Sequence, residues 1–273
     1  MGTLLELPFR LRYVPLNVES LRTPFWCLNF GSLLSFGKVA IDGLSIITQA
    51  GGAGASCIEA MGGLTVNQLR WIFSNYTAEK LEATGWDATS LANSDDDDTT
   101  HLWSELSADC PEAEIKIGGH DSESGSFEYL AETIFADMDN GESFDVKRPD
   151  GYFASAEDPD IIDFITANAD AIAYVGYAYY QQNADTVSAA PIENDAGVYV
   201  APSATTVGDG SYNPLSRLLY MNLLNDEDAL KFTVPFIRFG LGAAGDALVS
   251  KVGYVPIPEG SSPPLAISKS GSA

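Results

Sequence analysis

The residues best suited to binding chemistry stand together at Ser124, Gly125 and Ser126, just before an apolar helical pattern. From Phe127 to Ile134, apolar residues recur at spacings of three, four and seven, which predicts an amphipathic helix. Ser124 suits the N-cap of that helix, and Gly125 lets a ligand approach the backbone closely. The first amides of a helix lack internal partners and carry the positive end of its dipole. Two hydroxyls beside them therefore favour an anion site, although a serine-capped helix that binds nothing fits this stretch as well.

Glu123 is an unexpected neighbour for a simple anion site, because its carboxylate repels negative charge. The residue makes chemical sense if the anion carries a proton that needs an acceptor. A short β-type run, Glu114–Gly118, precedes the loop. Ligands of layered α/β proteins lie at the carboxyl ends of strands, near helix N-termini, and this loop occupies such a place.

Further strands and helices alternate along the chain, which predicts an α/β layered fold. Thr65 and Gln68 form a capping-box pattern before an apolar helical stripe. The other predicted segments follow from apolar runs and from helical periodicity. Strands are expected at 39–48, 172–175, 187–192 and 218–223, and helices at 65–73, 161–165, 229–240 and 244–251.

Charge argues against several classes of partner. The chain has 38 acidic and 14 basic residues and a net charge of −24, which repels nucleic acid and anionic lipid. No apolar run reaches the ~18 residues of a membrane helix, and no signal peptide is visible at the start.

The run Asp95–Asp98 reads as a solvated acidic loop, because the EF-hand spacing fails around it. With two histidines, His101 and His120, a structural zinc site is not expected, and we predict neither a metal nor a cofactor.

Three cysteines, Cys27, Cys57 and Cys110, show no metal-binding spacing. A disulfide between Cys57 and Cys110 is expected if the protein is exported, with Cys27 left free. Three unpaired thiols are an equally good interpretation.

Four motifs in order resemble the phosphate-binding proteins of the high-affinity ABC phosphate transporter, the PstS-like family, and most closely its SphX-like branch. Asp42-Gly-Leu-Ser-Ile resembles a hinge strand, followed by the helix from Leu64. Glu123-Ser-Gly-Ser-Phe-Glu-Tyr-Leu resembles the phosphate loop D-S-G-T-F-D-Y-F. Ala171-Ile-Ala-Tyr-Val-Gly-Tyr-Ala-Tyr-Tyr is similar to A-I-G-Y-F-G-Y-A-Y-Y. Tyr212-Asn-Pro-Leu-Ser-Arg resembles the return Y-x-P-L-S-R, and Val252-Gly-Tyr-Val-Pro resembles the family's ending.

This resemblance implies a two-lobed type II periplasmic-binding-protein fold, with mixed sheets flanked by helices and two lobes that close on phosphate through a hinge. Residues 39–210 would form lobe 2, with the phosphate loop at 120–127, and residues 211–258 would return to lobe 1. We expect strand 218–223 to lie outside the sheet that contains 114–118. The family's glycine- and serine-rich first loop is not found, so residues 1–38 are expected to be an atypical leader or an incomplete part of lobe 1. Residues 259–273 read as a flexible tail.

By the same resemblance, Ser124, Gly125 and Ser126 hold phosphate oxygens, and Glu123 accepts a phosphate proton or orients the loop. His120 stands where some members carry an arginine, so it joins the expected phosphate ligands. The implied function is that of an extracytoplasmic, monomeric substrate-binding protein, with inorganic phosphate and ABC permease subunits as partners, and without enzymatic activity.

Two other classes remain as alternatives. A binding or structural protein could keep the fold without binding phosphate, as the missing first loop suggests. A serine hydrolase with Ser124 as nucleophile is disfavoured, because no G-x-S-x-G motif is present and the histidines offer a poor base.

Overall fold

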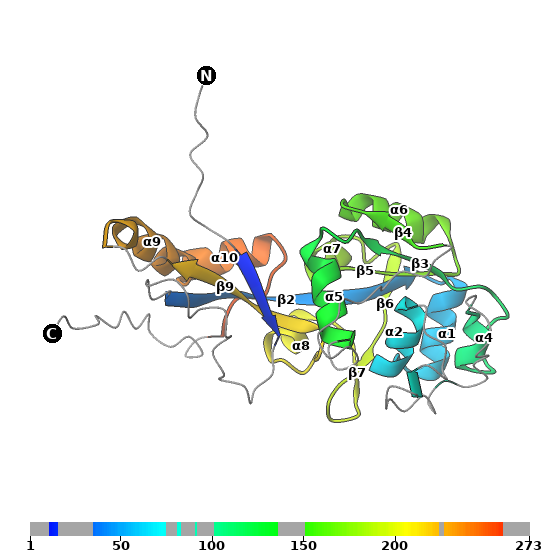
Figure 1. Ribbon diagram of the computed structural model, residues 1–273. Helices are drawn as coiled ribbons and strands as arrows, with labels where there is room; N and C mark the ends of the chain where they lie inside the picture. The colour runs from blue at the N-terminus through cyan, green and yellow to red at the C-terminus, as the bar shows by residue number, and fades with distance from the viewer. Residues whose placement is uncertain are drawn as a thin grey trace, which may run out of the picture. The chain divides into compact units, whose positions relative to one another are not determined.

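The computed structural model describes residues 11–15, 35–74, 81–82, 91, 101–135, 151–223 and 227–258 (Figure 1). The chain divides into a larger compact unit, Gly43–Ser216, and a smaller unit made of Met1–Asp42 and Arg217–Ala273. It therefore passes between the units twice, at Asp42/Gly43 and at Ser216/Arg217. Most of the expected leader, the acidic loop and the tail lie outside the described residues.

A mixed sheet forms the centre of the larger unit. In it β5 and β6 pair antiparallel with β2, while β3 pairs parallel with both β4 and β5. The strands are β2 (Ser35–Gln49, shared with the smaller unit), β3 (Lys116–His120), β4 (Phe153–Ser155), β5 (Ala171–Gly176) and β6 (Val187–Ala189). A separate antiparallel pair contains β7 (Ile192–Glu193) and β8 (Tyr199–Val200).

Helices flank this sheet, as the sequence predicts. They are α1 (Ala53–Met61), α2 (Val66–Phe73), α4 (Trp103–Leu106), α5 (Gly125–Phe135), α6 (Asp158–Ala167), α7 (Tyr177–Gln182) and α8 (Ala204–Gly208). Helix α6 covers one face (Figure 1), where Ile161 and Ile165 pack with Ala173 and Val175. On the other side of β5, Tyr174 meets the Phe73 ring edge-on, with ring centroids 5.6 Å apart. The sheet is thus covered on both faces.

The start of α2 confirms a prediction made from local sequence. The Gln68 amide donates to Thr65 Oγ1 at 3.0 Å, and the Thr65 amide donates to Gln68 Oε1 at 2.8 Å. This reciprocal capping box satisfies two amides at the helix start.

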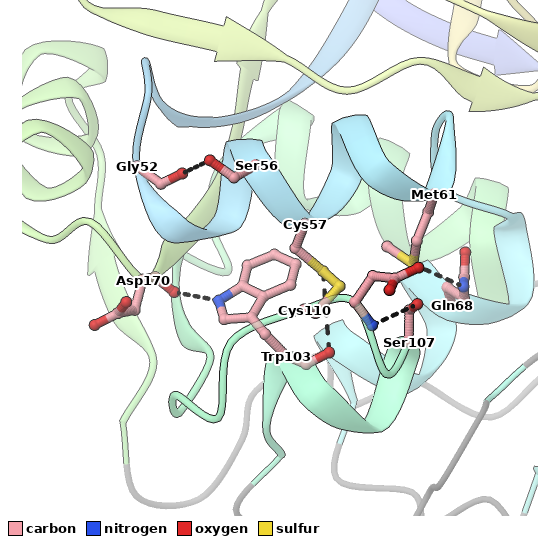
Figure 2. Close-up of a disulfide and its surroundings, with 10 residues drawn as sticks. Gly52, Ser56, Cys57, Met61, Gln68, Trp103, Ser107, Cys110 and Asp170 are labelled. Carbon is pink, nitrogen blue, oxygen red and sulfur yellow. Dashed lines mark hydrogen bonds between the residues drawn. A yellow bond between two sulfur atoms is a disulfide. The ribbon is translucent and has the colours of Figure 1, made fainter.

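A disulfide joins Cys57 and Cys110, whose Cα atoms are 4.7 Å apart, which confirms the expected pairing. Figure 2 shows the bridge between α1 and the segment that precedes β3. Beside it lies Trp103, whose buried indole N–H donates to the Asp170 carbonyl at 2.9 Å. Cys27 lies outside the described residues.

The smaller unit contains β1 (Leu11–Pro15), the first part of β2, β9 (Ser216–Leu223), α9 (Glu227–Gly240) and α10 (Ala243–Lys251). Strand β1 pairs antiparallel with β9, and Ile41 bridges to Val255. Among the residues described, no single helix is long and apolar enough to span a membrane, although the bent pair Lys231–Gly240 and Ala243–Lys251 passes that test together.

The expectation that strand 218–223 shares no sheet with 114–118 is wrong. The hydrogen-bonded strand order is β1-β9-β2-β5-β3-β4, which contains both β9 and β3. The reason is the length of β2, which at 15 residues belongs to both units. The assignment of the two units as lobe 2 and lobe 1 stays a prediction.

Candidate functional site

The carboxyl ends of three parallel strands meet at one edge of the larger unit's sheet. Strand β3 ends at His120, β4 at Ser155 and β5 at Gly176, and α5, α6 and α7 begin shortly after them. The amides at these helix starts and the loops before them are the usual ligand-binding place in such sheets. The residues predicted from sequence, 120 and 123–126, all lie at this edge.

The loop between β3 and α5 is organised by Asp121, a residue that the sequence analysis missed. Its Oδ1 accepts the Glu123 amide at 3.1 Å, and its carbonyl accepts the Ser124 amide at 3.1 Å. The Asp121 amide in turn donates to the Ser155 carbonyl at 3.2 Å. An aspartate that accepts the amide two residues ahead is a common turn-forming residue, and this was the signal available in the sequence.

Ser124 occupies the N-cap position of α5, as predicted. Its Oγ accepts the Ser126 amide at 3.2 Å, and its carbonyl accepts the Glu128 amide at 3.1 Å. The Ser124 hydroxyl hydrogen remains available for an anion, because accepting a bond does not use it. Among the described residues the Ser126 hydroxyl has no hydrogen-bond partner. Ser124 and Ser126 are both half-buried beside the helix start, and each hydroxyl has a hydrogen that it can donate.

The charge around the loop is negative. The Glu123 side chain is exposed, and Asp121 lies two residues before it. Within the described part of the larger unit, the lysines and arginines are Lys116, at the opposite end of β3, and Arg70 on α2. Among the described residues of this edge, the groups that favour an anion are therefore hydroxyls, amides and the helix dipole.

His120 is buried, with 4% of its surface exposed. Its Nε2 lies 3.3 Å from Asp158 Oδ1 at the start of α6, but the angle does not make a hydrogen bond, and Nδ1 has no hydrogen-bond partner. Its neighbour two residues back, Gly118, faces Phe164 of α6, so strand alternation places His120 on the α6 side of the sheet. The role of His120 as a phosphate ligand stays a prediction.

Two tyrosines, the buried Tyr174 and the half-buried Tyr152, hold the backbone at the end of β3. The Tyr152 hydroxyl donates to the His120 carbonyl at 2.7 Å and lies 2.9 Å from the Tyr174 hydroxyl. Burial raises the pKa of both phenols far above the ordinary value. They therefore stay protonated donors near neutral pH and fix the backbone from which the loop starts.

We expect Tyr152→Phe to lower the free energy of unfolding by about 1–2 kcal/mol, because it removes a part-buried hydrogen bond to the His120 carbonyl. Urea denaturation followed by circular dichroism measures this change. The control is Tyr180→Phe, since Tyr180 packs against the α6 core and no hydroxyl bond is found for it in the described chain. Equal losses in the two variants would contradict the role given to Tyr152.

Comparison with known proteins identifies the class of fold. No family model matches the chain. The crystal structure of a possible phosphate binding protein from Planctomyces limnophilus superposes with a TM-score of 0.59 and 29% identity, over 84% of this chain and 69% of that protein. An ABC-type phosphate transport receptor from Vibrio cholerae gives a TM-score of 0.56 at 17% identity, over 81% and 72%, and supports the fold alone. The chain has the type II periplasmic-binding-protein fold.

Sequence comparison gives the particular relatives. Protein SphX of Synechococcus elongatus is 27% identical over 197 residues, which are 71% of this chain and 53% of SphX. The phosphate-binding protein PstS of Staphylococcus haemolyticus is 29% identical over 161 residues, 58% of this chain and 46% of PstS. The chain thus spans about half the length of the curated relatives it matches. The predicted resemblance to SphX and PstS is confirmed, and the PstS homologue is named a phosphate-binding protein.

Proposed function

We propose that this chain binds inorganic phosphate at the start of α5, as the substrate-binding protein of a high-affinity ABC phosphate uptake system. The observation that carries the proposal is the serine-capped start of α5 at the carboxyl edge of parallel strands, in a homologue of SphX and PstS. Ser124 and Ser126 would donate their hydroxyls, and Gly125 and Ser126 would offer backbone amides. The Ser126 amide would have to exchange or share its present acceptor, Ser124 Oγ.

Glu123 would supply selectivity in this site. Its exposed carboxylate can accept a hydrogen bond from monohydrogen phosphate, whereas sulfate carries no proton near neutral pH and is repelled. The Asp121 side chain would hold the Glu123 backbone in place for this role. His120 would contribute its imidazole as a further ligand, or its contact with Asp158 at the start of α6 would support the loop.

The proposal includes an extracytoplasmic location and a permease partner of the ABC class, with the protein acting as a monomer. The Cys57–Cys110 disulfide supports the location, because such bridges persist in oxidising compartments. A hydrolase is not favoured by the geometry: the His120 nitrogens make no hydrogen bond, so this imidazole does not activate Ser124.

Ser124→Ala combined with Ser126→Ala is expected to weaken phosphate binding at least about a hundredfold. Each hydrogen bond to a charged group contributes roughly 1.5–3 kcal/mol, and ~1.4 kcal/mol corresponds to a factor of ten in affinity. Isothermal titration calorimetry with phosphate measures the loss, and Glu123→Gln should narrow the difference between phosphate and sulfate. Ser56→Ala is the control, because the Ser56 hydroxyl bonds within α1 to the Gly52 carbonyl.

Two outcomes would count against the proposal. Parental affinity in the double serine variant would place the site elsewhere. A parent chain that binds no phosphate would favour a binding or structural protein that keeps the fold without this ligand.

A further inference from the structure

The hydroxyl of Tyr129 connects α5 to a segment far away in sequence. Tyr129 is the fifth residue of α5, 1% exposed, and its hydroxyl donates to the Pro214 carbonyl at 2.8 Å across 85 positions. A buried hydroxyl needs such a partner. At a rise of about 1.5 Å per residue, Tyr129 lies only ~6 Å along the helix from Gly125. The bond therefore fixes the end of α5 that carries the proposed phosphate loop.

Pro214 belongs to the segment through which the chain leaves the larger unit. The same segment is bonded to Leu44, through which the chain enters that unit: the Leu44 amide donates to the Leu215 carbonyl at 2.8 Å, and the Tyr212 hydroxyl donates to the Leu44 carbonyl at 3.0 Å. Burial raises the pKa of Tyr212, so its phenol stays a donor. The segments through which the chain enters and leaves the larger unit are thus joined by hydrogen bonds to both the amide and the carbonyl of Leu44.

The two segments bonded at Leu44 and Leu215, called the crossing below, lie at the same sheet edge as the candidate loop. Leu44 stands opposite Gly176, the last residue of β5, in the β2–β5 register. The Tyr129–Pro214 bond therefore joins two neighbouring parts of one edge, the start of α5 and the two chain segments that are bonded at Leu44 and Leu215.

We propose that Tyr129 is a positioning residue that couples the start of α5 to the two crossing segments that meet at Leu44 and Leu215. Occupancy of the anion site then stabilises the crossing, and loosening the crossing weakens the site. The part of this inference that concerns phosphate rests on the proposed function, whereas the coupling of α5 to the crossing is independent of any ligand.

Hydrogen exchange of single amides in the ligand-free protein tests the coupling directly. Tyr129→Phe keeps the ring and removes the bond to Pro214, so the Leu44 amide should exchange about three- to tenfold faster. The Trp103 amide, which bonds to Ala113 near the disulfide, serves as an internal reference and should keep its rate. The matched control is Tyr179→Phe, which removes a hydroxyl of α7 and should leave the Leu44 rate unchanged.

Addition of 1 mM inorganic phosphate forms the second arm. In the parent, phosphate should slow exchange at Leu44, and in Tyr129→Phe most of this protection should be lost while calorimetry still detects binding. An unchanged Leu44 rate in ligand-free Tyr129→Phe overturns the proposal. An equal acceleration at Leu44 and Trp103 also overturns it, because the bond would then support the whole unit. If the parent binds phosphate without any change in the Leu44 exchange rate, the coupling between the ligand and the crossing is refuted. If the parent binds no phosphate, the proposed function fails, and the experiment without ligand alone tests the role of Tyr129.

Discussion

Replacing both Cys57 and Cys110 by alanine is expected to lower the free energy of unfolding by about 4 kcal/mol. The bridge closes a loop across 53 positions, and the chain-entropy model gives this magnitude for a loop of that length. Urea denaturation of the variant measures the loss. The parent in a strong reductant should unfold at nearly the same urea concentration as the variant, because reduction and substitution release the same loop.

Cys27→Ala serves as the control, since the bridge leaves that residue out, and its midpoint should stay close to that of the parent. A loss below about 1 kcal/mol in the double cysteine variant would contradict the expected role. The loop would then be held mainly by its other contacts, among them the Trp103 bond to the Asp170 carbonyl.

Local sequence patterns predicted the elements that depend on neighbouring residues. The capping box at Thr65 and Gln68 and the serine cap at Ser124 are both confirmed, because each needs only three or four consecutive residues to form. The helix over 229–240 is likewise found as α9, even with Pro235 inside it. In α9 the periodic apolar pattern outweighed the single unfavourable proline.

Strand boundaries were predicted less well, and glycines explain the main error. The run 114–118 was expected to be a strand, but β3 is Lys116–His120 and includes Gly118 and Gly119. Read alone, these glycines indicate a break. In the structure they are required by packing, because a Cβ at Gly118 would lie 2.7 Å from the Phe164 ring, and one at Gly119 would collide with Tyr174. Such contacts come from distant segments and leave no local signal.

A second boundary error has a backbone cause. The expected strand 187–192 is two strands, β6 and β7, in different sheets. Pro191 lies between them and offers no amide for a ladder hydrogen bond. Because Pro191 is present in the sequence, the break between the two strands was predictable.

The contacts that hold the candidate site were beyond sequence reasoning for a different reason. Tyr129 and Pro214 are 85 positions apart, and Tyr212 and Leu44 are 168 apart. A tyrosine in an apolar stripe predicts burial, but nothing nearby says which carbonyl its hydroxyl will meet. The candidate binding residues of the loop could therefore be predicted from the sequence, whereas the side chains that position the loop are known only from the structure.

Removing one member of the buried Asp42–Arg217 pair should be as costly as removing the disulfide. Arg217 Nη2 and Nε lie 2.9 Å and 3.1 Å from Asp42 Oδ2, and the two side chains are only 3% and 7% exposed. These residues stand where the smaller unit's two chain segments meet the larger unit in sequence. Arg217→Met retains much of the aliphatic volume but deprives a buried carboxylate of its arginine, which is expected to cost about 3–5 kcal/mol.

The double variant Asp42→Leu with Arg217→Met separates the two explanations for such a loss. If the cost of Arg217→Met comes from a stranded charge, removing the carboxylate as well should recover stability to within about 1 kcal/mol of the parent, because apolar replacements of a whole buried pair are often neutral. Urea unfolding of the parent, both single variants and the double variant completes the cycle. Arg238→Met on the exposed surface of α9 is the control and should change stability by no more than ~0.5 kcal/mol. A double variant less stable than Arg217→Met would mean that the ion pair itself, with its hydrogen bonds, stabilises this junction of the fold.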